Sequence, residues 1–143
     1  EMGHIAGSEI DGRTIAYDLS LEGMMNQKKD FIGKRSLSRQ AFNEEGREKI
    51  VGVVPLDKKT SIPEGSYLVK DAKAKLPNPK LGHVSASCWS VEYDNPFSLA
   101  IIKNGKIRMG EKLFAVSPLK NTSIPVEIVS HHYVDPNGKR VRS

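Results

Sequence analysis

The sequence predicts a protein that is mainly β with some α, in which a helical segment precedes a small antiparallel barrel or sandwich. Two observations lead to this prediction. From about residue 49 onward, short apolar and β-branched runs alternate with turn residues, and turns about every 8–12 residues are typical of small all-β domains. Before residue 49 the segments are polar and rich in helix-forming residues, so we place a boundary there.

The helical segment is expected to begin near Asp30, which is a suitable N-cap residue. Phe31, Ile32 and Leu37 would then form one apolar face. Ala41 follows Leu37 by one helical turn. We therefore expect a helix of roughly three turns in this region.

Six segments beyond the boundary have the composition of strands. They lie between turn residues and cover 49–56, 67–69, 81–90, 97–103, 106–116 and 123–130. The run 97–103 reads as a buried strand, and Asn104-Gly105 after it predicts a tight hairpin into 106–116. The run 123–130 alternates apolar and polar residues, as a half-buried strand does. The basic, turn-rich tail 134–143 is expected to fray.

The composition limits the class of protein. The chain has 143 residues, a net charge of +5 and one cysteine. A single cysteine fits a reducing compartment, and we find neither a signal-peptide pattern nor an apolar run near the ~18 residues of a membrane span. We therefore expect a cytoplasmic protein with no membrane partner. The positive charge favours anionic partners such as nucleic acid, phosphates, folates or an acidic subunit.

The sulfur and imidazole side chains predict no catalytic or metal centre. On an extended strand Cys88 and His83 would face opposite sides, so we interpret Cys88 as a buried structural residue. His131 and His132 would also face opposite sides, and the spacings typical of metal ligands are absent from the sequence. The sequence also lacks both common glycine-rich phosphate loops, which gives no support to nucleotide binding.

A basic small barrel can bind nucleic acid, usually with aromatic side chains beside a cationic groove. Here aromatic residues make up only 6% of the chain, and the Lys and Arg residues are dispersed along it. We therefore do not expect RNA or DNA to be a partner.

The acidic residues near the start are candidates for a binding role. They are Glu9, Asp11 and Asp18, and any of these carboxylates could hold a cationic or amino-bearing ligand through charge-assisted hydrogen bonds. Helix capping by Thr14 or Asp18 is the commoner use of such residues. From residue types alone we favour capping.

Seven segments together resemble a known family. They are "GSEIDGRTIAYDLSL", "KKDFIGKRSL", "IVGVVPLD", "IPEGSYLV", "LGHVSASCWSVEYDNPFSLAII", "GEKLFAV" and "HHYVDPNGKR". Their order and spacing resemble the C-terminal part of the glycine-cleavage T-protein (aminomethyltransferase) family, and the likeness covers nearly the whole chain. The ending "YVDPNGKR" resembles most the alpha subunits of heterotetrameric sarcosine oxidases within this family.

The resemblance implies a division of the chain and a place in a larger enzyme. Residues 1–48 resemble the end of the α+β folate-binding domain, residues 49–133 its C-terminal β-barrel, and 134–143 a basic tail. Members of the family bind tetrahydrofolate and transfer a one-carbon unit to it. The complete oxidase would also hold FAD, FMN and NAD outside this chain, and its other subunits would be partners.

The resemblance also implies site residues. The family pattern Thr-Thr-Pro-x-Glu falls on 14–18, so Asp18 takes the place of the acid that helps to hold the folate pterin. Arg47 matches a folate-contacting basic residue before the first barrel strand, with Lys49 as the alternative. No catalytic residue is expected, because the family's catalytic aspartate lies upstream of the matched region.

Three alternatives remain open at this point. A T-protein and a protein similar to dimethylglycine oxidase share the family pattern. A basic β-barrel that binds RNA or docks a partner subunit belongs to a different class.

Overall fold

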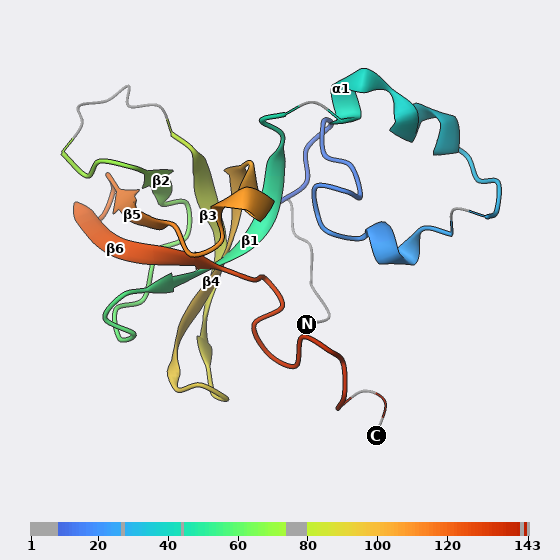
Figure 1. Cartoon of the computed structure of the whole chain (residues 1–143). Coiled ribbons are helices and arrows are strands. Elements are labelled where there is room, and N and C mark those ends of the chain that lie inside the picture. The colour runs from blue at the N-terminus through green and yellow to red at the C-terminus, as the bar shows by residue number, and fades with distance from the viewer. Residues whose placement is uncertain (1–8, 27, 44, 74–79, 141, 143) are drawn as a thin grey trace.

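The computed structural model describes residues 9–26, 28–43, 45–73, 80–140 and 142. Six strands form a closed antiparallel barrel in the order β1-β4-β3-β2-β5-β6, and β1 closes it by pairing with both β4 and β6 (Figure 1). The strands are β1 (Glu48–Pro55), β2 (Tyr67–Val69), β3 (Gly82–Ser90), β4 (Asn95–Lys103), β5 (Lys112–Ser117) and β6 (Thr122–Val129). The predicted β architecture is confirmed, and the fold is a barrel rather than a sandwich.

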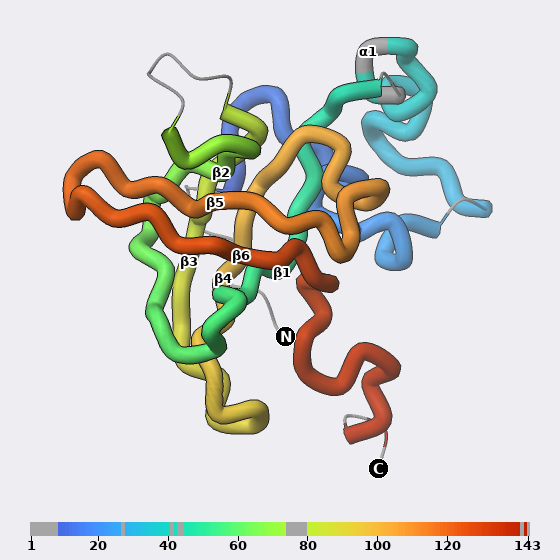
Figure 2. The backbone as a smooth tube through the Cα atoms, turned by 60° about the vertical axis from the view of Figure 1, so that its left-hand side comes forward, coloured from blue at the N-terminus to red at the C-terminus, as the bar shows by residue number. Residues whose placement is uncertain are grey.

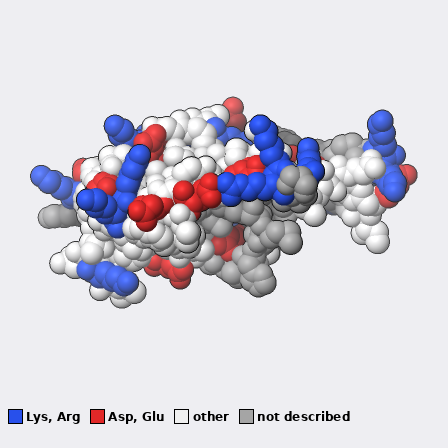
Figure 3. Space-filling model, turned by 90° about the horizontal axis from the view of Figure 1, so that it is seen from below, with Lys and Arg blue, Asp and Glu red and all other residues white. Residues whose placement is uncertain are grey.

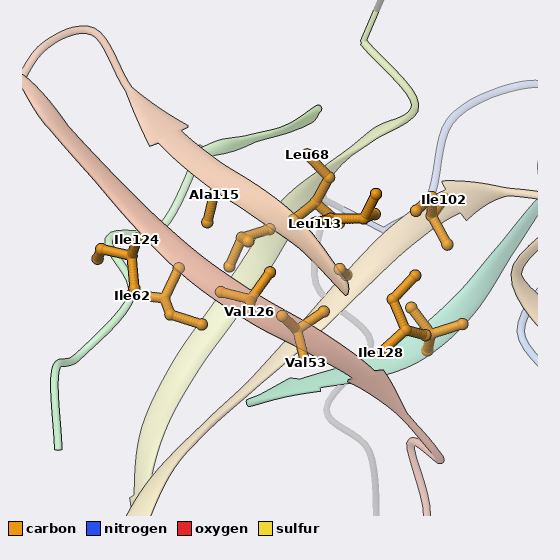
Figure 4. Close-up of a cluster of buried hydrophobic side chains, with 12 residues drawn as sticks. Val53, Ile62, Leu68, Ile102, Leu113, Ala115, Ile124, Val126 and Ile128 are labelled. Carbon is orange, nitrogen blue, oxygen red and sulfur yellow. The ribbon is translucent and has the colours of Figure 1, made fainter. Parts of the chain in front are cut away.

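The barrel interior is filled by aliphatic side chains, as Figure 4 shows. On β6 the buried residues are Ile124, Val126 and Ile128, which alternate with more exposed positions. This period of two puts one set of side chains inside the barrel. The alternation expected for this strand is therefore confirmed.

Strand β4 is buried on both faces, as its apolar sequence predicts. Ala100 and Ile102 belong to the interior cluster. On the outside, Ile101 packs with Leu19 and with Ile50 of β1. The segment before β1 therefore covers the outer surface of two adjacent strands, and Figure 2 shows it lying beside the barrel.

The single helix expected after Asp30 is wrong. Among its described residues, the segment before β1 contains only the short elements η1 (Glu22–Met24), η2 (Lys34–Ser38) and α1 (Gln40–Asn43). Gly33 has a left-handed φ of 93° and separates Asp30 from η2. Ile32 is fully exposed, so the expected apolar face does not form. In Figure 1 these elements lie to one side of the barrel. None of the described helices is long and apolar enough to cross a membrane.

The hairpin predicted at Asn104-Gly105 is also wrong. Asn104 does adopt a left-handed conformation, with φ 58°, but the short helix η3 (Gly105–Arg108) follows it. β4 pairs with β1 and β3, whereas β5 pairs with β2 and β6. Closure of the barrel therefore separates two strands that are consecutive in the sequence.

The described part of the C-terminal tail has no regular secondary structure, and side-chain contacts link it and the residue before it to the barrel. Arg140 donates hydrogen bonds through both Nη atoms to the Glu92 carboxylate in the β3–β4 turn. The Tyr133 ring stacks on Phe97 of β4. One contact at Tyr133, just before the tail, and one at Arg140 within it therefore connect the chain after β6 to the β3–β4 hairpin.

Candidate ligand-binding pocket

The two residues predicted to bind folate contact each other. Arg47 donates from Nε to Oδ1 of Asp18 at 3.0 Å and from Nη2 to Oδ2. Lys49 donates from Nζ to the same Oδ1 at 3.2 Å. The backbone N–H of Ile15 donates to Oδ2 at 3.1 Å. A carboxylate has about four lone-pair sites, so these four donors use the acceptor capacity of Asp18.

The Asp18 carboxylate is almost completely buried, with a side-chain exposure of 7%. Burial by itself would raise its pKa. Hydrogen bonds from Arg47, the Ile15 amide and Lys49 outweigh that effect, and the pKa of Asp18 is lowered from 3.8. The carboxylate is therefore charged at neutral pH and compensated by two cations.

Backbone contacts place these side chains. Asp18 lies in a turn, and its backbone carbonyl accepts a hydrogen bond from the Ile50 amide at 2.8 Å. The side chains of Leu19 and Ile50 pack together next to this bond. Arg47 directly precedes β1, and Lys49 is its second residue. Side chains two residues apart share one face of an extended chain. The two cations therefore point at the same carboxylate.

A pocket with a volume of about 440 Å³ opens beside this ion pair. Four of its lining residues are acidic: Glu9, Asp11, Asp18 and Glu48. Carboxylates in a partly enclosed site can accept hydrogen bonds from ligand amino and ring N–H groups. The volume is within the ~300–1,000 Å³ that is usual for small-molecule sites.

Three further lining residues of the same pocket are the cations Arg13, Arg47 and Lys103. Arg13 forms an ion pair with Asp11 at 2.7 Å, and its carbonyl accepts a hydrogen bond from Nη2 of Arg47 at 2.9 Å. Guanidinium and ammonium groups bind ligand carboxylates. The pocket can therefore contact both an N–H-rich ring and a carboxylate.

The helix-capping interpretation of Thr14 and Asp18 is wrong. Both residues lie in turns, and no described helix begins at either of them. The Thr14 hydroxyl instead accepts from the Asp11 amide at 3.0 Å, within the turn that lines the pocket. Both side chains stabilise turns rather than helix ends.

Sequence reasoning missed several lining residues, among them His83, Ile101 and Lys103. These come from β3 and β4, where His83 pairs in register with Ile101. Alternation within each strand could have placed Ile101 and Lys103 on one face. The pairing of β3 with β4 that adds His83 depends on register, which the sequence pattern did not specify.

The expected positions of Cys88 and His83 are wrong. Cys88 is exposed, because it lies near the tip of the β3–β4 hairpin. A β-bulge lies between Val84 and Ala86, and it shifts the alternation by one residue. His83 pairs with Ile101 and Cys88 with Phe97, so both share the outer face of the barrel. Their partners on β4, Ile101 and Phe97, are four residues apart, which corresponds to ~13 Å along a strand. This distance is too large for a nucleophile and its base.

The expectation for the adjacent histidines is wrong as well. β6 ends at Val129, and the His131 and His132 rings lie 3.8 Å apart beyond it. Strand alternation does not apply to this irregular segment. No group of three or more His, Cys, Asp or Glu side chains is placed to hold a metal ion in the described ranges.

Comparison with known proteins places this geometry in a family context. No protein-family model matches the chain. The sarcosine oxidase alpha subunit of Rhizobium meliloti (strain 1021) is 36% identical over 143 residues, which are 99% of this chain and 14% of that subunit. The sarcosine oxidase alpha subunit of Corynebacterium sp. (strain P-1) is 35% identical over 138 residues, which are 95% of this chain and 14% of that subunit. The chain thus spans only 14% of the length of these relatives.

Among solved structures, the glycine cleavage system aminomethyltransferase T from Bartonella henselae superposes with a TM-score of 0.66 and 18% identity. The match covers 90% of this chain and 34% of that one. The chain therefore has the fold of the corresponding part of an aminomethyltransferase T. Its sequence is homologous, over nearly its whole length, to a segment of sarcosine oxidase alpha subunits. The resemblance identified from the seven segments is confirmed.

Proposed function

We propose that the chain is a C-terminal part of the alpha subunit of an enzyme that oxidises sarcosine or a related N-methylated amine. The observation that supports this most is the 36% identity to a sarcosine oxidase alpha subunit over 99% of the chain. Other subunits would supply the rest of the active enzyme, and FAD, FMN and NAD would bind outside this chain. The single cysteine is consistent with our placing this enzyme in the cytoplasm.

We assign the pocket beside Asp18 and Arg47 to tetrahydrofolate. Bound there, the folate would accept the one-carbon unit released from the oxidised amine as 5,10-methylenetetrahydrofolate. Its pterin carries N–H donors and its glutamyl tail carries carboxylates. The acidic and basic residues that line the pocket provide partners for both. Holding the folate in place would favour this capture through proximity.

Within this pocket Arg47 is the better candidate for direct ligand contact. Its Nε and Nη2 groups already donate to Asp18 and to the Arg13 carbonyl, so a ligand carboxylate would have to contact Nη1. Asp18 already accepts four hydrogen bonds, two of them from Arg47. Direct contact of the pterin with Asp18 would require one donor to leave, and the Lys49 contact, at 3.2 Å, is the longest of the four. We therefore assign Asp18 mainly to fixing the plane of the Arg47 guanidinium.

Calorimetric titration of tetrahydrofolate into the chain, without oxygen, tests this assignment. Wild type should bind, and Arg47→Lys and Asp18→Ala should each weaken binding by about tenfold or more, since each loses charge-assisted hydrogen bonds. Arg140→Lys is the matched control, because Arg140 pairs with Glu92 on the β3–β4 turn. Absence of binding in wild type, or equal affinity of Arg47→Lys and wild type, would contradict the folate assignment.

The chain alone should not oxidise sarcosine, because the flavins of the proposed enzyme would lie elsewhere. Hydrogen peroxide formation from sarcosine by the purified chain would contradict this part of the proposal. An aminomethyltransferase or a dimethylglycine-oxidase-like enzyme would share the same pocket. Comparing sarcosine, dimethylglycine and aminomethyl donors with the enzyme that contains this chain distinguishes these substrates.

RNA binding is less well supported by the charge distribution. On the face seen in Figure 3, Lys and Arg side chains lie among Asp and Glu side chains. A nucleic-acid surface normally presents a patch or stripe of one sign. A salt-dependent mobility shift with single-stranded RNA would nevertheless favour that class.

A further inference from the structure

The Asn104-Gly105 pair does not form the expected hairpin, yet it makes close contacts with the segment that carries Arg47. The Asn104 backbone N–H donates to the Arg47 carbonyl at 3.0 Å. The Asn104 side-chain Oδ1 accepts from the Gly46 N–H at 2.7 Å. The left-handed φ of 58° at Asn104 lets its own amide and its side chain engage these two neighbouring residues. Asn104 is thus hydrogen-bonded to the backbone N–H of Gly46 and to the backbone carbonyl of Arg47.

Gly105 approaches β1 at the residue that supplies the second cation. A Cβ added at Gly105 would lie 3.1 Å from both Cβ and O of Lys49. It would also lie only 2.7 Å from Cγ1 of Val51. Only glycine allows the backbone after β4 to lie this close to β1 without displacing it.

We propose that Asn104 and Gly105 are positioning residues for the ligand pocket: they fix the backbone from Gly46 to Lys49 so that Arg47 and Lys49 both reach Asp18. The Arg47 guanidinium lies at the end of a long side chain, so a small rotation of the backbone at Arg47 would displace it enough to weaken its bonds to Asp18. The same connection begins at Lys103, which itself lines the pocket. Because this role concerns the pocket that we assign to tetrahydrofolate, it rests on the proposed function.

Two variants at Asn104 separate the side-chain bond from the backbone conformation. Asn104→Gly tolerates the left-handed conformation and removes the oxygen that accepts from Gly46. Asn104→Asp keeps an oxygen acceptor and also tolerates this conformation. Gly105→Ala is a third variant, in which the added methyl pushes against Lys49 and Val51.

The first readout is the NMR signal of the Arg47 Nε–H, assigned by its loss in Arg47→Lys. This N–H donates to Asp18 at 3.0 Å, so its chemical shift reports the ion pair directly. The second readout is the calorimetric affinity for tetrahydrofolate. Urea unfolding of each variant shows whether it is folded under the conditions of both measurements.

In Asn104→Gly the Arg47 signal should shift, and the affinity should fall about tenfold, which corresponds to ~1.4 kcal/mol. Asn104→Asp should recover both values, and Gly105→Ala should resemble Asn104→Gly. An unchanged Arg47 signal in folded Asn104→Gly overturns the inference. If wild type fails to bind tetrahydrofolate, the proposed function fails, and the Arg47 signal still decides whether Asn104 positions Arg47.

Discussion

Arg47 and Asp18 join the segment before the barrel to the start of β1, with Nε and Oδ1 3.0 Å apart and a second bond from Nη2. The pair is largely buried, since the side-chain exposures are 19% for Arg47 and 7% for Asp18. A buried ion pair adds little net stability, but removing one partner leaves an uncompensated charge. Replacing either residue alone is therefore expected to destabilise the protein.

Asp18→Asn should lower the free energy of unfolding by about 2–4 kcal/mol, because Arg47 and Lys49 would lose their common counter-charge. Urea unfolding monitored by Trp89 fluorescence measures the loss. Asp11→Asn is the control, since its partner Arg13 is 88% exposed, and exposed pairs contribute little. An equal loss of unfolding free energy in both variants would show that removing a partner from the buried Asp18 pair costs no more than removing one from the exposed Asp11 pair.

His131 should make stability depend on pH below neutrality. Burial, assisted by the nearby His132, lowers the pKa of His131 from 6.5 to about 4. The unfolded chain therefore takes up a proton at His131 near pH 6.5, whereas the folded chain does so only near pH 4. The free energy of unfolding should fall as the pH falls from about 6.5 to about 4.

The measurement is urea unfolding at several pH values between 7 and 4, for wild type and His131→Gln. The variant should lose part of the slope, because it cannot bind the proton. His83→Gln is the control variant, because it removes a histidine from a different site, the wall of the pocket. Identical slopes in wild type and His131→Gln would contradict the role of His131.

The strands could be predicted because their signals are local. Alternation over 123–130 and the apolar run over 97–103 each reflect which faces are buried, and both strands occur in the barrel. The Asn104-Gly105 dipeptide also has a strong local preference, and Asn104 does take the left-handed conformation. Its hairpin was wrong because strand order in a closed barrel depends on pairing between distant segments.

The contacts of the candidate site likewise depend on distant segments and could not be predicted from local sequence patterns. Residue types alone favoured helix capping for Asp18, and only the resemblance to a family pointed to Asp18 and Arg47 together. Their contact joins distant parts of the chain, as does the neighbouring hydrogen bond from the Ile50 amide to the Asp18 carbonyl. The β-bulge between Val84 and Ala86 also reversed the predicted face of Cys88, and no local pattern revealed it.

Gly82 should be intolerant of any side chain. A Cβ at this position would lie 2.1 Å from the Ile101 carbonyl oxygen and 2.7 Å from the Ile102 Cα. These are backbone atoms of β4, which is held between β1 and β3 and cannot move aside easily. Gly82→Ala should therefore lose about 2 kcal/mol or more of unfolding free energy.

Thermal and urea unfolding of Gly82→Ala measure this loss. Gly23→Ala is the matched control, because nothing lies within 4 Å of a Cβ built there. Its stability should change by no more than about 0.5 kcal/mol. Wild-type stability in Gly82→Ala would mean that β3 and β4 are farther apart than described.

Tyr133 should anchor the tail to the β3–β4 hairpin. Its ring stacks on Phe97 with centroids 4.6 Å apart and 13° between the planes, and Tyr93 lies 4.8 Å away on a tilted plane. Its hydroxyl oxygen accepts from Asn95 Nδ2 at 3.1 Å. Aromatic pairs contribute ~0.5–1.5 kcal/mol beyond area burial, and one such hydrogen bond contributes about 1 kcal/mol.

Tyr133→Ala should therefore cost about 2 kcal/mol, whereas Tyr133→Phe should cost about 1 kcal/mol because only the hydrogen bond is lost. Trypsin cleavage after Lys139 and Arg140 provides a second measurement, since a released tail is cut faster. Cleavage should accelerate in Tyr133→Ala and remain close to the wild-type rate in Tyr133→Phe. Equal acceleration in both variants would assign the anchoring to the Asn95 hydrogen bond, and no acceleration in either would assign it to the Arg140–Glu92 pair.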